Sequence, residues 1–194
     1  MKLSDKCETV ILVRPQTTDT GAKMSKMKEL AQTIDDGGIL GKAAEYIYDG
    51  WKVLPLKPHS KDPHFDLIKR AYLDASNEWE MLKFWHKMDP NMNIGIACQP
   101  SGLVVFDVDF RNGGEIIEEL TPTFTVKTGD GFHFYYKAPV ETLFKGTLQE
   151  GIDIKWKGYV AAAPSIHPNG KTYEIVNHME PQIINEDLLE MGAK

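Results

Sequence analysis

Two aspartates, Asp107 and Asp109, are the first candidates for chemistry in this sequence of 194 residues. They end a nearly continuous apolar run that begins at Leu103. In a strand, side chains two residues apart share a face and lie roughly 6.5–7 Å from each other. Carboxylates at that spacing can hold two divalent ions about 3.5–4 Å apart, as phosphoryl-transfer enzymes do. The pattern predicts a metal site, and its alternative is a strand that ends in a solvated acidic loop.

A histidine and a third aspartate occupy similar alternating segments further along the chain. His133 stands between two phenylalanines, and Asp153 stands between two isoleucines. If these segments share a sheet whose apolar faces meet one core, the three carboxylates and the imidazole converge on the opposite face. This arrangement predicts a site for two divalent ions and a nucleoside triphosphate. For Asp153, an ion pair with Lys155 is an equal alternative.

The turn before His133 is a candidate phosphate site. Gly129 and Gly131 let backbone N–H groups point toward an anion, and the Thr128 hydroxyl adds a donor. The alternative is an ordinary hairpin turn followed by a surface histidine. Lys61 and Ser165 are further candidate phosphate contacts, whose alternatives are a solvated lysine and a serine that caps a turn.

Composition limits the class of protein. The formal net charge of −6 argues against a large, non-specific duplex-binding surface, because such surfaces gather Lys and Arg. The two cysteines, Cys7 and Cys98, form no metal-binding spacing, so we expect no zinc and a reducing cytoplasmic location. No apolar run approaches the roughly 20 residues that cross a bilayer, so no membrane partner is expected. Residues 1–9 are too polar for the core of a secretion signal.

Hydrophobic periodicity and turn residues predict an α+β domain. Helices are expected at 39–49, after an Asn77–Glu80 capping box, at 113–120 and at 186–191. Strands are expected at 9–14, 51–56, 93–98, 103–109, 123–128, 132–137, 151–155, 159–163 and 171–176. We expect residues 1–36 to be an extension of unknown role, 37–180 to be the catalytic domain, and 181–194 to be a tail with a short helix.

Taken in order, these segments resemble the N-terminal catalytic domain of bifunctional DNA primase/polymerases, in the archaeo-eukaryotic primase superfamily. The resemblance covers residues 39–176. It rests on Gly50-Trp51-Lys52-Val53-Leu54-Pro55-Leu56, Lys61-x-Pro63, Asn93-Ile94-Gly95-Ile96-Ala97, Ser101-Gly102 with the acidic strand, Thr128-Gly129-x-Gly131-x-His133, Gly151-Ile152-Asp153-Ile154 and Ala163-Pro164-Ser165. The ordered set with similar spacings, more than any one piece, carries the resemblance.

The resemblance implies a fold and a set of roles. The fold is an RRM-like antiparallel or mixed sheet packed with an N-terminal α/β lobe. Asp107, Asp109 and Asp153 would bind two Mg²⁺ or Mn²⁺ ions, and His133 would complete the catalytic set by contacting the triphosphate. The nucleotide-binding residues would be His133, Thr128, Gly129, Gly131, Lys61, Ser165 and Lys155. Three positions depart from the family pattern: Asp130 in a turn that usually carries glycine, Lys155-Trp156 for a common Arg-Gly, and Ala163 for a proline.

The family implies a DNA-directed nucleotidyltransferase, a primase or polymerase that adds NTP or dNTP to a 3′-hydroxyl. Its partners would be single-stranded or primed DNA and a helicase or helical priming module, in the replication of a phage, plasmid or mobile element. The host would be a bacterial, archaeal or phage-infected cell. Two alternatives are a non-catalytic nucleotide- or single-strand-binding module and a metal-dependent phosphohydrolase of the haloacid-dehalogenase type. The latter usually has its Asp-x-Asp strand near the N-terminus, whereas 100 or so residues precede it here.

Overall fold

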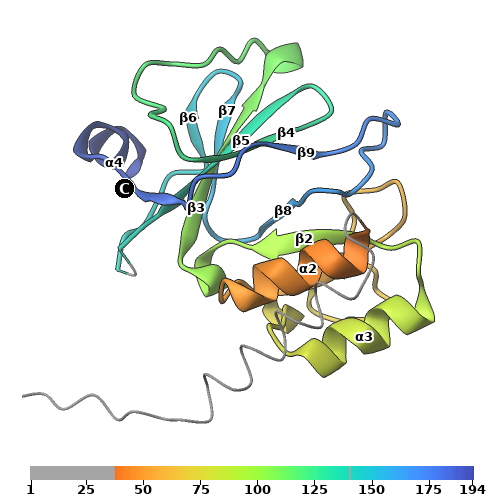
Figure 1. Cartoon of the computed structure of the whole chain (residues 1–194). Coiled ribbons are helices and arrows are strands. Elements are labelled where there is room, and N and C mark those ends of the chain that lie inside the picture. Colours follow the sequence, from red (N-terminus) through yellow and green to blue (C-terminus); the bar gives the residue numbers. More distant parts are fainter. Residues whose placement is uncertain (1–37, 140) are drawn as a thin grey trace, which may run out of the picture.

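Two β-sheets and a few helices form the protein in the computed structural model, which describes residues 38–139 and 141–194 (Figure 1). The predicted strand at 9–14 and the predicted extension at 1–36 lie outside the described residues. The mixed α+β class predicted from the sequence is confirmed, with antiparallel pairing in nearly every strand contact.

The smaller sheet has three antiparallel strands in the order β1-β2-β8. They are β1 (Val53–Leu56), β2 (Asn93–Ala97) and β8 (Tyr159–Ala161). Helices α2 (Ile39–Tyr48) and α3 (Trp79–Met88) lie against one side of this sheet in Figure 1, and a short 3₁₀ helix, η1 (Ala71–Asp74), precedes α3. Every residue of β1 and β2 is buried, which explains why both strands are apolar apart from Asn93.

The larger sheet has seven strands, six of them in the order β6-β7-β3-β5-β4-β9. They are β3 (Leu103–Asp109), β4 (Phe124–Lys127), β5 (Gly131–Lys137), β6 (Thr147–Gln149), β7 (Ile152–Lys155) and β9 (Glu174–Asn177). Strand β10 (Gln182–Ile183) pairs in parallel with the end of β5, and helix α4 (Glu186–Gly192) follows it. Two 3₁₀ turns flank β3, η2 (Gln99–Ser101) and η3 (Phe110–Asn112).

Both faces of the central strands β3 and β5 are buried, in two different cores. On one face, Val105 and Tyr135 belong to the core shared with the smaller sheet and α2. On the other face, Phe106 and Phe134 belong to a second core that includes Leu188 of α4. The acidic residues of β3 therefore continue the face that meets the smaller sheet, and they lie between the two sheets at the end of a buried strand.

Several elements differ from the sequence prediction. Residues 114–120 form no helix, because Asp109 caps the turn η3 instead and only Ile117 and Leu120 of that segment reach the core. The capping box at Asn77 is also absent: Glu78 is the N-cap of α3, and the Ser76 hydroxyl accepts a hydrogen bond from its N–H. The strands predicted at 159–163 and 171–176 are shorter, at Tyr159–Ala161 and Glu174–Asn177. The tail helix is present as α4.

Candidate active site

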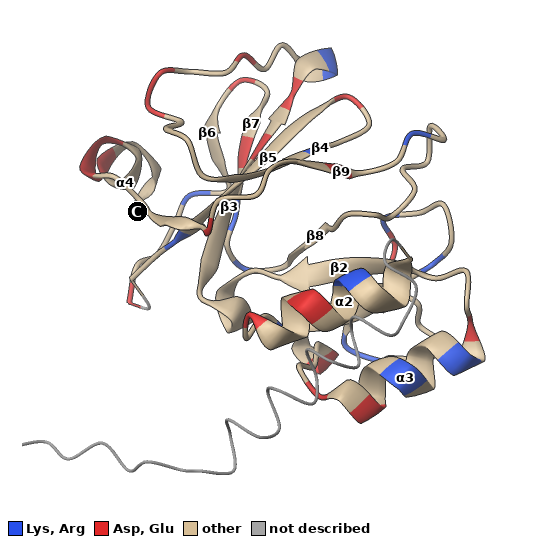
Figure 2. Ribbon diagram, viewed as in Figure 1, with Lys and Arg blue, Asp and Glu red and all other residues tan. Residues whose placement is uncertain are grey.

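Strand register brings three of the predicted site residues together. Asp107 on β3 lies directly opposite His133 on β5 and, on its other side, directly opposite Asp153 on β7. Directly opposed residues in antiparallel strands have their Cα atoms about 4.5–5.5 Å apart and their side chains on one face. Figure 2 shows the acidic stretches of β3 and β7 side by side in the larger sheet. Asp107 is the centre of this group.

Asp107 and His133 are in direct contact at the inner end of the group. His133 Nε2 lies 3.4 Å from Asp107 Oδ1, and the His133 side chain is only 5% exposed. Burial on its own would raise the pKa of Asp107, but the charge and hydrogen bond of His133, with the charges of Lys155 and Lys61, lower it to about 2. Asp107 is therefore held as a carboxylate at neutral pH.

The other two aspartates are each paired with a basic side chain. Asp109 accepts hydrogen bonds from the Arg111 N–H at 3.0 Å and from the Asn112 side chain at 2.8 Å, and the Arg111 guanidinium lies 3.3 Å away. Asp153 accepts from Lys155 Nζ at 2.8 Å and from the Thr147 hydroxyl at 3.1 Å. The ion pair with Lys155, one of the two alternatives for Asp153, is thus present.

The chemical type and the backbone positions of the three carboxylates suit a hard divalent cation. Mg²⁺ and Mn²⁺ prefer oxygen ligands, and three carboxylates on one face of neighbouring strands supply them. Within residues 38–139 and 141–194, however, no three His, Cys, Asp or Glu side chains are grouped closely enough to hold an ion as they stand. Metal binding by Asp107, Asp109 and Asp153 stays a prediction, and it requires Asp109 and Asp153 to leave their basic partners.

The turn between β4 and β5 is tightly built. The Thr128 N–H donates to the Gly131 carbonyl at 2.9 Å, and the Thr128 hydroxyl accepts from the Asp130 N–H at 3.3 Å. A Cβ atom at Gly129 would lie 2.4 Å from His167 Nδ1, and one at Gly131 would lie 1.8 Å from the Val108 carbonyl oxygen. Both glycines are therefore required by close packing. Their predicted contact with phosphate stays a prediction.

The predicted lysines face the group, whereas Ser165 does not. Lys61 and Lys155 both lie near enough to Asp107 for their charges to lower its pKa. Ser165 is fully buried, and its hydroxyl accepts from the Ile94 N–H at 2.9 Å and donates to the Ile94 carbonyl at 3.0 Å. The structure gives Ser165 a structural role that joins the loop after β8 to β2, in place of the predicted phosphate contact.

Two residues outside the predicted site set, Tyr173 and His167, belong to the same group. The ring centroid of Tyr173 lies 5.9 Å from that of His133 and 5.8 Å from that of His167. The Tyr173 hydroxyl and His133 Nδ1 are both buried and have no hydrogen-bond partner among the described residues. Burial lowers the pKa of His167, although its hydrogen bond with Asn169 acts in the opposite direction. No periodic pattern in the sequence links these side chains, because they come from a turn and an irregular loop.

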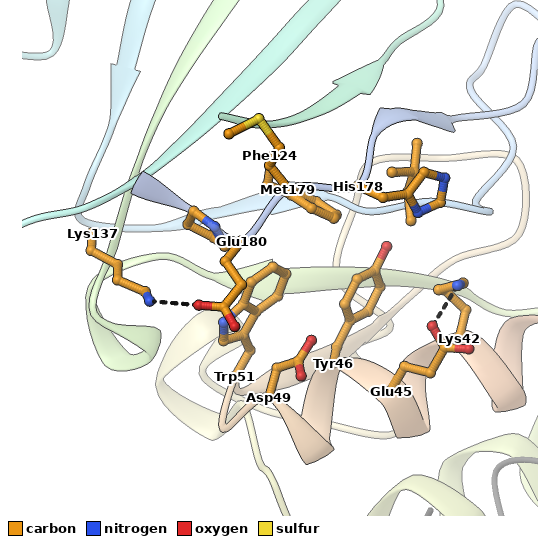
Figure 3. Close-up of a pocket in the computed structure, with 12 residues that line it drawn as sticks. Lys42, Glu45, Tyr46, Asp49, Trp51, Phe124, Lys137, His178, Met179 and Glu180 are labelled. Atoms are coloured by element: carbon orange, nitrogen blue, oxygen red, sulfur yellow. Dashed lines mark hydrogen bonds and ion pairs between the residues drawn. The ribbon is translucent and has the colours of Figure 1, made fainter. Parts of the chain in front are cut away.

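A separate cavity of about 300 Å³ lies between α2 and the segment after β9 (Figure 3). Ion pairs at its rim join Lys137 to Glu180 and Lys42 to Glu45. It contains none of the predicted site residues.

The fold and the group around Asp107 define the class: a mixed α+β domain with an acidic, histidine-containing site on the larger sheet. The family model of the bifunctional DNA primase/polymerase N-terminal domain matches residues 43–187, so the chain belongs to this family. The family is one of primase/polymerase-type nucleotidyltransferases. A search of curated proteins found no significant match. None of the helices among the described residues has the length and apolar character needed to cross a bilayer.

Proposed function

We propose that this protein is a DNA-directed nucleotidyltransferase that adds NTP or dNTP to a 3′-hydroxyl on a template, with Mg²⁺ or Mn²⁺ as cofactor. The family match supports the reaction class. The observation that carries the proposal is the register of Asp107, which lies directly opposite both His133 and Asp153. The strands β7, β3, β5 and β4 are our proposed counterpart of the RRM-like core that the family resemblance implies.

The proposed reaction breaks a phosphoanhydride bond of the nucleotide and forms a phosphodiester bond. The oxygen of the 3′-hydroxyl forms a bond to the α-phosphorus of the incoming nucleotide, and the bond from that phosphorus to the bridging oxygen breaks. Pyrophosphate leaves with the bonding electron pair, and the hydroxyl proton passes to solvent. Bound metal ions would lower the pKa of the attacking hydroxyl and stabilise charge on the leaving oxygens.

The position of each side chain indicates its proposed role in binding metal or triphosphate. Asp107, charged at neutral pH and central in the register, would hold the metal ions together with Asp109. Asp153 would be the third acidic ligand, and Asp109 and Asp153 would first leave Arg111 and Lys155. Lys155, Lys61 and His133 would then hold the triphosphate, since cationic groups at its oxygens neutralise charge in the transition state. Positioning and charge neutralisation supply most of such catalysis.

One observation favours a second candidate, a nucleotide- or single-strand-binding module without turnover. Arg111 and Lys155 neutralise two of the three carboxylates in the described structure. If those ion pairs persist when nucleotide binds, the carboxylates cannot hold metal. The family match favours a primase/polymerase over the phosphohydrolase alternative.

Extension of a labelled primer on a DNA template tests the proposal directly. The full chain, with Mg²⁺ or Mn²⁺ and with each nucleotide type in turn, is expected to lengthen the primer. EDTA is expected to stop the reaction, because carboxylate-bound ions are exchangeable. Nucleotide binding without extension under every metal and nucleotide condition would favour the second candidate. Absence of both binding and extension would contradict both.

Replacing His133 with alanine is expected to raise the KM for nucleotide about tenfold, with a smaller effect on kcat. A hydrogen bond from this side chain to a charged phosphate contributes about 1.5–3 kcal/mol. Steady-state extension kinetics check the result, with thermal melting to confirm folding. His133→Gln, which keeps a donor, should lose less, and His178→Ala in the separate cavity should have no effect. An unchanged KM in His133→Ala would return His133 to a structural role.

A further inference from the structure

A second cavity, of about 390 Å³, lies at the tip of the β4–β5 hairpin, and its lining includes the turn at 128–131 and Arg111, which contacts Asp109. Its apolar part comes from Phe110 and Phe132, whose ring centroids are 5.7 Å apart in an edge-to-face contact. Phe110 is 48% exposed although it directly follows a buried strand. An exposed aromatic ring in a concave surface is available to stack on a flat ligand.

Cationic side chains surround these rings. The lining includes Arg111, Lys127 and Lys171 against the carboxylate of Asp130, and Arg111 also contacts Asp109, so these five side chains have a formal charge of +1. The side chains of Arg111 and Lys171 are 59% and 62% exposed even though both contact Asp130. Lys127 is exposed and forms no ion pair with any other described residue. A chain with a net charge of −6 thus carries a locally positive hollow around two aromatic rings.

The hollow adjoins the acidic group through the backbone. Phe110 follows Asp109 in the chain, so their Cα atoms are about 3.8 Å apart. Phe132 lies opposite Val108 on β3 and next to His133 on β5. Phe132 faces the opposite side of the sheet from His133, so the hollow meets the acidic group only at the hairpin tip, where Arg111 lines the hollow and contacts Asp109.

We propose that the hollow formed by Phe110, Phe132, Arg111, Lys127 and Lys171, here named the hairpin-tip platform, binds single-stranded DNA by stacking one base on Phe110. The cations contact the flanking phosphates. Aromatic rings beside a positive groove are how proteins bind single strands without reading sequence, since every base has a π-face. The placement of this strand as primer or template rests on the proposed function, whereas its binding does not.

The cavity in Figure 3 does not share these properties. Its aromatic side chains Trp51 and Phe124 are only 6% and 8% exposed, and Trp51 is already stacked between Tyr46 and Tyr135. Its lining also carries three carboxylates against two lysines. The hairpin-tip platform alone of these two cavities offers an exposed ring together with excess positive charge.

Binding of a fluorescein-labelled single-stranded oligonucleotide to the full chain, followed by anisotropy with EDTA and without nucleotide, tests the platform. Phe110→Ala is expected to raise Kd about tenfold, since stacking on one ring is worth about 1–3 kcal/mol. Phe110→Trp should bind within about twofold of the unsubstituted protein. The matched control is Phe84→Ala on α3, where the side chain is 50% exposed, and it should leave Kd unchanged.

Salt dependence separates the phosphate contacts from stacking. Lys127→Gln should weaken binding and reduce the slope of log Kd against log salt by about one, whereas Phe110→Ala should leave the slope unchanged. Lys87→Gln on α3 is the matched control and should change neither quantity.

The outcomes distinguish this proposal from the proposed function. Unchanged Kd in Phe110→Ala, an equal loss in Phe84→Ala, tighter binding to duplex than to single strand, or no binding at all would each overturn the platform, even if the protein extends primers. Loss of binding in Phe110→Ala by a protein that never extends a primer would uphold the platform and overturn the proposed function. Where both hold, Phe110→Ala should raise the KM for primer–template with little change in kcat.

Discussion

Replacing Asp107 with asparagine is expected to lower primer extension by on the order of 10³-fold or more while the protein remains folded. Asparagine keeps the shape of the side chain and an oxygen for His133 Nε2, which lies 3.4 Å from Asp107 Oδ1. It loses the negative charge that a divalent cation requires, at the one position opposite both His133 and Asp153. The loss should appear mainly in kcat, measured by steady-state extension with Mg²⁺ or Mn²⁺.

Asp107→Asn should also change the stability of the protein in a pH-dependent way, because it removes the charge of Asp107. The pKa of Asp107 in the folded protein is about 2, below the ordinary value of about 3.9, so ionised Asp107 stabilises the fold at neutral pH. Asp107→Asn should therefore unfold at a somewhat lower urea concentration at pH 7. The difference from the unsubstituted protein should shrink between pH 4 and pH 2, where Asp107 itself becomes protonated.

The control for Asp107→Asn is Glu80→Gln on α3, which neutralises a carboxylate that is 80% exposed and outside the site. It should leave extension unchanged. Retained metal-dependent extension in a variant lacking both Asp107 and Asp109 would contradict the assigned active site. Equal losses of extension in Asp107→Asn and Glu80→Gln would show that general charge, and not position, is responsible.

The central part of the site could be predicted from sequence because it depends on strand alternation. Asp107, His133 and Asp153 each stand between apolar neighbours, so a period of two places them on one face once their strands pair. The pairing of β3 with β5 and β7 joins strands that are not consecutive in the chain, so the sequence predicts the face of each residue and the structure supplies the register. The α+β class was predictable from the same alternation.

The rest of the site depends on contacts that no local pattern encodes. The Arg111–Asp109 contact arises in a 3₁₀ turn, and the Tyr173–His133 contact joins a loop to a strand about 40 residues earlier. The helix predicted at 113–120 does not form. Two glycines at its start lower helix propensity, and the few apolar residues after them do not make an apolar face large enough to offset that loss. A family motif predicted Ser165 to contact phosphate, but its hydroxyl instead bonds the backbone of Ile94. The two residues are 71 positions apart, so no local pattern indicates this contact.

Replacing Gly131 with alanine is expected to lower the free energy of unfolding by about 3 kcal/mol or more, and to abolish extension with it. A Cβ atom here would lie 1.8 Å from the carbonyl oxygen of Val108, which is a backbone atom in the neighbouring strand and cannot rotate away. Strands β3 and β5 would have to separate where Asp109 lies opposite Gly131 and Asp107 lies opposite His133. Urea unfolding followed by circular dichroism measures the loss.

Gly146→Ala is the matched control, since a Cβ atom there would have no neighbour within 4 Å and no positive φ is involved. Its free energy of unfolding should stay within about 0.5 kcal/mol or rise slightly. A Gly131→Ala protein as stable as the Gly146→Ala protein would show that the two strands are not this close in solution. Because Asp107→Asn should remove extension and keep the fold, whereas Gly131→Ala should remove both, the pair separates the chemistry of the carboxylates from the strand pairing that positions them.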